Sequence, residues 1–332
     1  MRANLAAFRR RRIVPRMLED VSQRDLSREV LRTAMPAPVM VAPIGVQSIV
    51  HPEGELASAR AAAALGVPFV ASTASSFTLE EIAEAAGDGP RWFQLYWPRG
   101  EELVASFLHR AEAAGYGAIV VTLDSWLLGW RPRDLQLAYL PFLEGVGIAN
   151  YLADPVFRAA LAAPPEDDPQ AAVGHFIGVF ANPGVTWDDL AFLRSTTGLP
   201  LLLKGILHPD DARRARDAGV DGIVVSNHGG RQVDGAIAAL DALPGVIEAL
   251  GGELPVLLDS GVRSGADALK ALALGARAVL LGRPVMWGLA LDGEEGVRRV
   301  LRAFLADLDL ALALSGHRSP DELGPHVLAP AP

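Results

Sequence analysis

Short apolar runs recur along the chain, and each is followed by an alanine-rich stretch whose apolar residues repeat at the period of a helix. Runs that are apolar at every position are typical of strands buried on both faces of a parallel sheet. The predicted strands cover residues 39–42, 68–71, 92–96, 118–123, 200–204, 222–226, 255–259 and 278–281. The predicted helices cover residues 53–65, 79–86, 101–114, 187–195, 209–218, 237–250, 265–274 and 294–314. Eight strand–helix repeats close most naturally into an α/β fold, the (β/α)8 TIM barrel.

One connection is much longer than the others. The predicted strands start 22 to 33 residues apart, except those that start at 118 and 200, which are 82 apart. The excess, residues 127–186 (the insertion), follows strand 4 and contains several prolines and an aromatic-rich segment at 139–142. A long loop on the catalytic face of a barrel is typically a lid or a binding segment, and a second small domain is the alternative. We expect a single barrel domain over residues 1–332, with the insertion as its lid.

Polar groups follow every predicted strand. The connections after the strands of a barrel converge on one mouth, so a functional site is expected there. Each strand end carries a side chain that can hydrogen-bond or a backbone that a ligand can approach: Pro43-Ile44-Gly45, Ser72-Thr73, Gln94 and Tyr96, Thr122 and Asp124, Lys204, Ser226-Asn227-His228, Asp259-Ser260-Gly261, and Gly282-Arg283. A barrel with a purely structural role has no need for this set.

Two of these strand ends carry groups suited to electron and proton transfer. Lys204 ends an apolar run, where its charge requires an anionic partner. An electron-rich ring that becomes anionic on reduction is such a partner, and a lysine that extends to the barrel rim is the alternative. His228, in the segment 226–232, is able to move a proton near neutral pH. The glycines after it let a ligand approach the backbone, and Arg231 offers two parallel donors to a carboxylate.

Further charged residues are predicted to assist His228 and Arg231. Asp124 is placed to stabilise a protonated histidine, and Arg131 to share the binding of a carboxylate with Arg231; an ion pair between Asp124 and Arg131 is the alternative. Glycine-rich turns with an arginine follow strands seven and eight, where barrels commonly bind phosphate. Their residues are Gly261, Arg263, Gly282 and Arg283.

Composition excludes several classes of function. The chain has no cysteine, which excludes disulfides, thiol nucleophiles and iron–sulfur clusters. Its net charge of -9 opposes a general affinity for nucleic acid or anionic membrane, and the basic run at 9–12 is typical of a solvated helix end. No apolar run approaches the roughly 18 residues that cross a bilayer, and no signal peptide is recognisable, so a cytoplasmic protein is expected.

With these residues the sequence resembles the FMN-dependent 2-hydroxy-acid dehydrogenase and oxidase family. The likeness covers most of the chain and rests on the segments 2–4, 51–55, 93–96, 204–205, 226–232, 259–263 and 282–284. Further segments are similar to the lactate 2-monooxygenase branch of the family: 122–126, 129–135, 150–151, 154–157 and 208–215.

The resemblance implies FMN as the cofactor, a small 2-hydroxy acid and O2 as the other partners, and a homotetramer or octamer. It implies His228 as the catalytic base, with Asp124 and Lys204 as further catalytic residues. The implied substrate contacts are Tyr96, Arg131, Arg231 and Ala74. The implied cofactor contacts are Pro43, Ile44, Gly45, Ser72, Gln94, Thr122, Lys204, Ser226, Asp259, Gly261, Arg263, Gly282 and Arg283.

Two departures from the family pattern bear on activity. Ala74 stands where glycolate oxidase has a tryptophan, which implies more room beside the substrate's side chain. The family segment that precedes residues 2–4 and carries a substrate-contacting tyrosine is absent from the sequence.

We expect lactate 2-monooxygenase activity, in which L-lactate and O2 give acetate, CO2 and water. The alternatives are an L-2-hydroxy-acid oxidase or dehydrogenase that releases the 2-keto acid (with H2O2 if an oxidase), and a flavin-binding protein without turnover.

Overall fold

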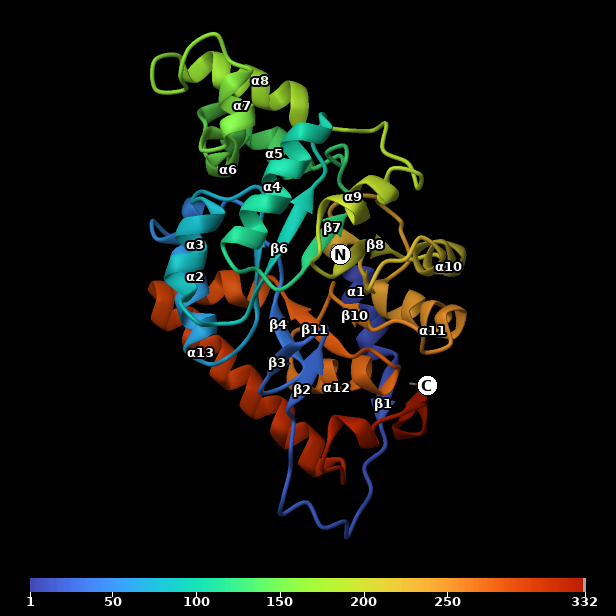
Figure 1. The fold of residues 1–332 in the computed structure, drawn as a ribbon. Coiled ribbons are helices and arrows are strands. Elements are labelled where there is room, and N and C mark those ends of the chain that lie inside the picture. Colours follow the sequence, from blue (N-terminus) through green and yellow to red (C-terminus); the bar gives the residue numbers. More distant parts are fainter. Residues whose placement is uncertain (331–332) are drawn as a thin grey trace.

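Eight parallel strands close into a barrel in the computed structural model, which describes residues 1–330 (Figure 1). They are β4 (Val39–Val41), β5 (Phe69–Ser72), β6 (Arg91–Tyr96), β7 (Ile119–Thr122), β8 (Leu201–Ile206), β9 (Gly222–Val225), β10 (Val256–Leu258) and β11 (Ala278–Leu281). They follow one another around the barrel in chain order, and β11 pairs with β4 to close it. All eight predicted strands are present to within two residues at each end, so the predicted (β/α)8 fold is confirmed.

Helices surround the barrel. They are α2 (Gly54–Ala63), α3 (Leu79–Ala86), α4 (Glu101–Ala113), α9 (Leu190–Thr196), α10 (Pro209–Asp217), α11 (Ala239–Leu250), α12 (Gly265–Ala273) and α13 (Arg283–Leu314). The predicted last helix, residues 294–314, is the second part of α13, and the part that begins at Arg283 was not predicted. A kink at Asp292 and Gly293, where φ is -158° and 50°, separates an earlier helical piece from the predicted one. Arg283 is therefore the first residue of a helix, with Gly282 as its N-cap.

A hairpin closes the lower end of the barrel. Its strands, β2 (Arg28–Val30) and β3 (Thr33–Met35), lie below the barrel in Figure 1 and were not predicted. Apolar side chains of both strands join the cluster that fills the barrel interior, which includes the fully buried Trp92. The indole Nε1 of Trp92 donates a hydrogen bond to Thr33 Oγ1 at 2.8 Å, which satisfies its polar atom. The barrel is thus filled and covered below, and its polar residues lie at the other end.

The N-terminal helix packs beside the barrel. Helix α1 (Arg2–Arg9) is followed by β1 (Arg11–Ile13), which pairs antiparallel with β12 (Leu328–Pro330). Arg10 and Arg11, in the basic run, form ion pairs with Asp241 of α11. Among the helices of residues 1–330, none combines the length and the apolar composition of a membrane span.

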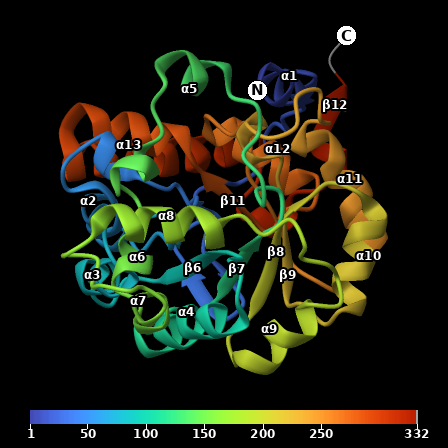
Figure 2. The ribbon, with the colours of Figure 1, turned by 90° about the horizontal axis from the view of Figure 1, so that it is seen from above.

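The insertion between β7 and β8 lies over the mouth of the barrel. It contains α5 (Pro132–Leu137), α6 (Ala149–Leu152), α7 (Pro155–Ala159) and α8 (Pro169–Phe180), which lie at the top of Figure 1 and toward the viewer in Figure 2. Aromatic rings hold it together: Tyr151 lies 4.9 Å from Phe176 and 5.0 Å from Phe107 of α4, between ring centroids. Phe180 in turn packs at 5.5 Å on Tyr96 of β6. The insertion therefore packs on the barrel through its own apolar contacts.

Close packing of α12 against α13 depends on a glycine. A Cβ on Gly265 would lie 2.2 Å from the backbone nitrogen of Leu308. Gly265→Ala must push the two helices apart, so we expect the free energy of unfolding to fall by about 1–3 kcal/mol in a denaturant titration. Gly174 of α8 is the matched control, because nothing lies within 4 Å of its added Cβ. Gly174→Ala should leave stability unchanged or raise it by up to about 1 kcal/mol. Equal losses in the two variants would contradict this account.

Candidate active site

A cavity of about 500 Å³ opens at the carboxyl ends of the barrel strands. Most of the predicted site residues line it: Pro43, Ile44, Gly45, Ala74, Tyr96, Arg131, Lys204, His228, Arg231, Asp259, Gly261, Arg263, Gly282 and Arg283. The other predicted cofactor contacts are buried strand-end residues that are not among its lining residues: Ser72, Gln94, Thr122 and Ser226. Asp124 borders a neighbouring cavity of about 330 Å³.

A histidine and an aspartate form a hydrogen-bonded pair at this mouth. His228 Nδ1 lies 2.9 Å from Asp124 Oδ1 and 2.9 Å from Ser125 Oγ. A carboxylate only accepts, so the proton on Nδ1 is assigned to the bond with Asp124, which leaves Nε2 as the basic nitrogen. Burial opposes the charge on Asp124, but Lys204 and the bond from His228 outweigh it and hold the pKa of Asp124 below its usual value. A charged Asp124 is suited to stabilise the imidazolium.

The backbone around His228 is fixed by Ser226 and by two asparagines to which the sequence interpretation gave no role. His228 has a left-handed φ of 55°, and its N–H donates to Ser226 Oγ at 3.0 Å. Asn227 accepts from the Gly230 N–H at 3.0 Å and exchanges two amide hydrogen bonds, of 2.7 and 2.8 Å, with Asn4 of α1. A strained backbone of this kind persists only where its surroundings determine it. The segments 2–4 and 226–232 were both recognised as motifs, but no sequence signal pairs residues 223 positions apart.

Lys204 is buried inside a network of acids and hydroxyls. Its Nζ lies 2.9 Å from Ser226 Oγ and 3.2 Å from Asp259 Oδ2, and the residue is only 3% exposed. The alternative of a lysine that extends to the barrel rim is therefore wrong. Burial works against the ammonium charge, but the carboxylates of Asp259 and Asp124 outweigh it, so the pKa of Lys204 is raised. The site thus holds a permanent cation beneath its opening.

Two arginines face each other beside the histidine, with one acid between them. Arg231 Nη2 lies 3.6 Å from Asp134 Oδ2, and Arg131 Nη1 lies 3.9 Å from the same oxygen. Arg131 also donates to Gln232 Oε1 at 3.0 Å. Burial and the nearby Arg231 lower the pKa of Arg131. The alternative of an Asp124–Arg131 ion pair is wrong, since Asp124 contacts His228. Sequence reasoning missed Asp134, although it lies one helical turn after Arg131.

A second pair of arginines lies at the other side of the cavity. Arg283 donates to Gly229 O at 3.2 Å, and Arg263 stacks 5.4 Å from the centre of the Trp287 ring. Within residues 1–330, neither guanidinium has a carboxylate within 4.0 Å. Burial lowers the pKa of both, and Arg263 lowers that of Arg283 further. Two cations without a counter-ion, beside Gly261 and a helix N-terminus, fit a phosphate group.

Buried polar groups beneath the cavity offer hydrogen bonds to a polar ring. Gln94 Oε1 accepts from Ser72 Oγ at 2.9 Å, while its Nε2 is buried without a partner among the described residues. A buried, unsatisfied donor is costly unless a ligand accepts its hydrogen bond. Together with Lys204 and the arginine pair, this donor set fits a group that has a polar ring at one end and a phosphate at the other. The residues present therefore fit FMN.

Comparison with known proteins agrees with this chemistry. Residues 1–330 match the model of the family described as FMN-dependent dehydrogenase. The chain is 48% identical over 319 residues to an L-lactate oxidase of Lysinibacillus sphaericus, covering 96% of this chain and 82% of that protein. It is 45% identical over 318 residues to a 4-hydroxymandelate oxidase of Amycolatopsis orientalis, covering 96% and 86%.

A solved structure of a mandelate oxidase variant with (S)-mandelic acid is also similar. It superposes with a TM-score of 0.85 at 42% sequence identity, covering 99% of this chain and 88% of that one. The expectation of an FMN-dependent enzyme of 2-hydroxy acids is confirmed at this level. The chain belongs to the FMN-dependent dehydrogenase family, its activity is the oxidation of a 2-hydroxy acid, and its cofactor is FMN.

Proposed function

We propose that this chain oxidises an L-2-hydroxy acid at the cavity described above. The observation that carries the proposal is the meeting of three groups on one cavity: the basic nitrogen of His228, paired with Asp124, and the cations of Arg131 and Arg231. A hydroxy acid offers one carboxylate and, beside it, one carbon with a hydroxyl group, and this CH–OH group must lose two protons and two electrons. The arrangement supplies a binding group for the first and a base for the second.

Each of these residues has a distinct role in the proposal. Arg231 and Arg131 bind the substrate carboxylate and displace Asp134 from between them. His228 accepts one of the two protons through Nε2, and Asp124 stabilises the imidazolium that results. Burial raises the pKa of Tyr96, so its hydroxyl stays protonated and able to donate a hydrogen bond to the substrate.

The cofactor contacts follow the same geometry. When bound, FMN would accept the two electrons together with the second proton. The ring contacts are the 43–45 backbone, Ser72, Gln94, Thr122 and Lys204, and Ser226 and Asp259 hold the lysine in place. The buried Lys204 cation stabilises negative charge that develops beside it. The phosphate contacts are Gly261, Arg263, Gly282 and Arg283.

The choice of acid depends on the wall at Ala74. An alanine side chain leaves space where a larger residue would fill it, and the similar proteins named above act on acids as different as lactate and 4-hydroxymandelate. We propose L-lactate as the substrate, with a larger acid such as (S)-mandelate as the second candidate. The L configuration is supported by the L-lactate oxidase likeness. An anaerobic titration tests this, because loss of the flavin absorbance with either acid identifies a substrate.

The insertion acts in the proposal as a lid. Leu128, Tyr139 and Phe142 of the insertion line the cavity, so product leaves only when they move. Hydrogen peroxide that stays with the keto acid oxidises it to acetate and CO2 with release of water, which is the lactate 2-monooxygenase outcome. Peroxide and keto acid that leave separately give the oxidase outcome.

The two outcomes differ in stoichiometry. We expect one acetate and one CO2 for each L-lactate and O2 consumed, with little free peroxide, measured by an oxygen electrode and product chromatography. One pyruvate and one H2O2 for each O2 would replace the monooxygenase proposal with an oxidase. A flavin spectrum that neither acid changes would instead identify a flavin-binding protein without turnover.

The base can be removed without removing the cofactor site. In His228→Asn we expect the rate of anaerobic flavin reduction to fall about 10²- to 10⁴-fold, because no group remains to accept the proton. Stopped-flow absorbance measures this rate, and the bound flavin absorbance should match that of the wild type. The control is His109→Gln, an exposed histidine of α4. A reduction rate in His228→Asn within a fewfold of the wild type would contradict the assignment.

The acid between the two arginines should compete with the substrate carboxylate. Asp134→Asn keeps the shape of the side chain and removes its charge, so we expect KM for the hydroxy acid to fall about 2- to 5-fold with kcat little changed, as for other exposed ion pairs. Steady-state kinetics at low ionic strength measures the change. Glu144→Gln, elsewhere in the insertion, should leave KM as in the wild type. A rise in KM would show that Asp134 assists binding instead.

A further inference from the structure

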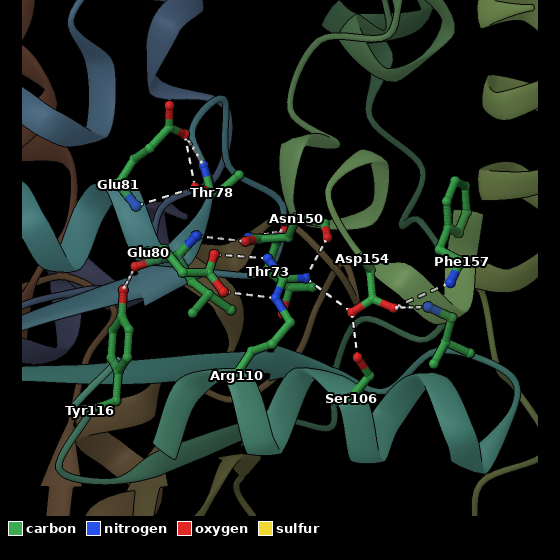
Figure 3. A network of polar contacts seen from close by, with 12 residues as sticks. Thr73, Thr78, Glu80, Glu81, Ser106, Arg110, Tyr116, Asn150, Asp154 and Phe157 are labelled. Carbon is green, nitrogen blue, oxygen red and sulfur yellow. Dashed lines mark hydrogen bonds and ion pairs between the residues drawn. The ribbon is translucent and has the colours of Figure 1, made fainter. Parts of the chain in front are cut away.

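Asn150, in α6 of the insertion, is fully buried and uses both ends of its amide (Figure 3). Its Nδ2 donates to Thr73 O and to Ser75 Oγ, each at 3.0 Å. Its Oδ1 accepts from the Leu79 N–H at 2.7 Å, at the start of α3. One side chain of the insertion thus holds the turn at 72–75, which follows β5.

The turn at 72–75 forms part of the cavity wall. Ala74 lies on it and lines the cavity. The Val46 N–H donates to Ala74 O at 2.9 Å, and Thr73, the residue before Ala74, is hydrogen-bonded to Gln94 of β6. From behind, the Ala149 N–H donates to Ser75 O at 3.2 Å, beside the bonds from Asn150. The position of Ala74 therefore depends on Val46 and β6 on one side and on the insertion on the other, and only the insertion bonds to Ser75 from behind.

The base of the insertion is anchored separately to α4. The fully buried Asp154 accepts from Ser106 Oγ at 2.7 Å and from Arg110 Nη1 at 3.0 Å (Figure 3). Arg110 also donates to the Asn150 carbonyl at 2.8 Å and binds Glu80 of α3 with both of its remaining nitrogens at 2.8 Å. These contacts hold α6 and α7 in place and leave the 72–75 turn untouched. Anchoring and holding the turn can thus be separated by mutation.

We propose that Asn150 is a positioning residue for substrate selection: it fixes the turn that carries Ala74 and so sets the width of the pocket beside the substrate's side chain. The inference rests on the proposed function in one respect, that the substrate's side chain lies against Ala74. Asn150 itself touches neither the cavity nor the reacting atoms.

Only an amide satisfies this arrangement. The Thr73 carbonyl can only accept, and the Ser75 hydroxyl is already engaged as a donor to Phe77 O. In Asn150→Asp an unprotonated carboxylate oxygen would replace Nδ2 and face these two acceptors without a proton. Their repulsion pushes the turn away from α6 and toward the cavity. A protonated carboxyl restores one donor, and burial raises the pKa of such a group, so lowering the pH reverses the change.

The test compares a small and a large substrate. In Asn150→Asp we expect kcat/KM for (S)-mandelate to fall about tenfold relative to that for L-lactate at pH about 8, and the wild-type ratio to return toward pH about 5.5. Ser106→Ala is the matched control, because it weakens the anchor at Asp154 without touching the turn, and it should keep the wild-type ratio. Ser75→Ala, an uncharged change on the turn itself, should move the ratio in the same direction by a smaller factor.

A second readout does not depend on turnover. The dissociation constants of pyruvate and benzoylformate, measured from the perturbation of the flavin absorbance, should shift in Asn150→Asp in the same ratio as kcat/KM. A wild-type chain that neither acid reduces would sink the proposed function, and the dissociation constants would still decide the role of Asn150. A ratio unchanged in Asn150→Asp at every pH, or shifted equally in Ser106→Ala, would overturn the inference.

Discussion

Charge buried at the mouth of the barrel has to be balanced within a few ångströms, and this requirement organises the site. Lys204 is held between Asp259 and the field of Asp124, and Asp124 in turn is bonded to His228. Removing any one of these groups leaves another uncompensated in a poorly solvated environment, which is far more costly than losing an exposed ion pair. The charge of Lys204 therefore affects His228 through Asp124, and the orientation of the histidine depends on all of these groups.

Two pairs of arginines at the mouth have fewer acids around them than Lys204 has, and the proposed function places one ligand at each pair. Within the described residues neither Arg263 nor Arg283 has a carboxylate within 4.0 Å, whereas Arg131 and Arg231 share Asp134 at 3.9 and 3.6 Å. In the proposed function a phosphate supplies the negative charge at the first pair, and a substrate carboxylate replaces Asp134 at the second. The two pairs therefore differ in one respect, because only the second has to exchange an ion pair of the chain when its ligand binds.

Much of this could be predicted from the sequence because the strands are apolar at every position and end in polar residues. Lys204 and His228 were identified because a polar or charged side chain directly after a buried strand is costly unless it has a partner or a function. Asn4, Asp134 and Asn150 were not assigned roles, because each acts through contacts that depend on the closed barrel. Asn150 shows this clearly: its partners lie 71 to 77 residues earlier, and only the packing of the insertion brings them together. The early start of α13 was missed for a local reason, the break at Asp292 and Gly293.

The hairpin beneath the barrel has a consequence for the order in which ligands arrive. Because Trp92 and the β2–β3 hairpin fill the lower end of the barrel, ligands of the cavity have to enter from the opposite end, where the strand-end residues line it. Gln94 and Lys204, which fit the flavin ring, are buried beneath the cavity, whereas Arg231 is half-exposed at its edge. In the proposed function FMN therefore has to be seated before an acid can bind productively. Each turnover would then exchange only the outer ligand, while the inner one stays in place.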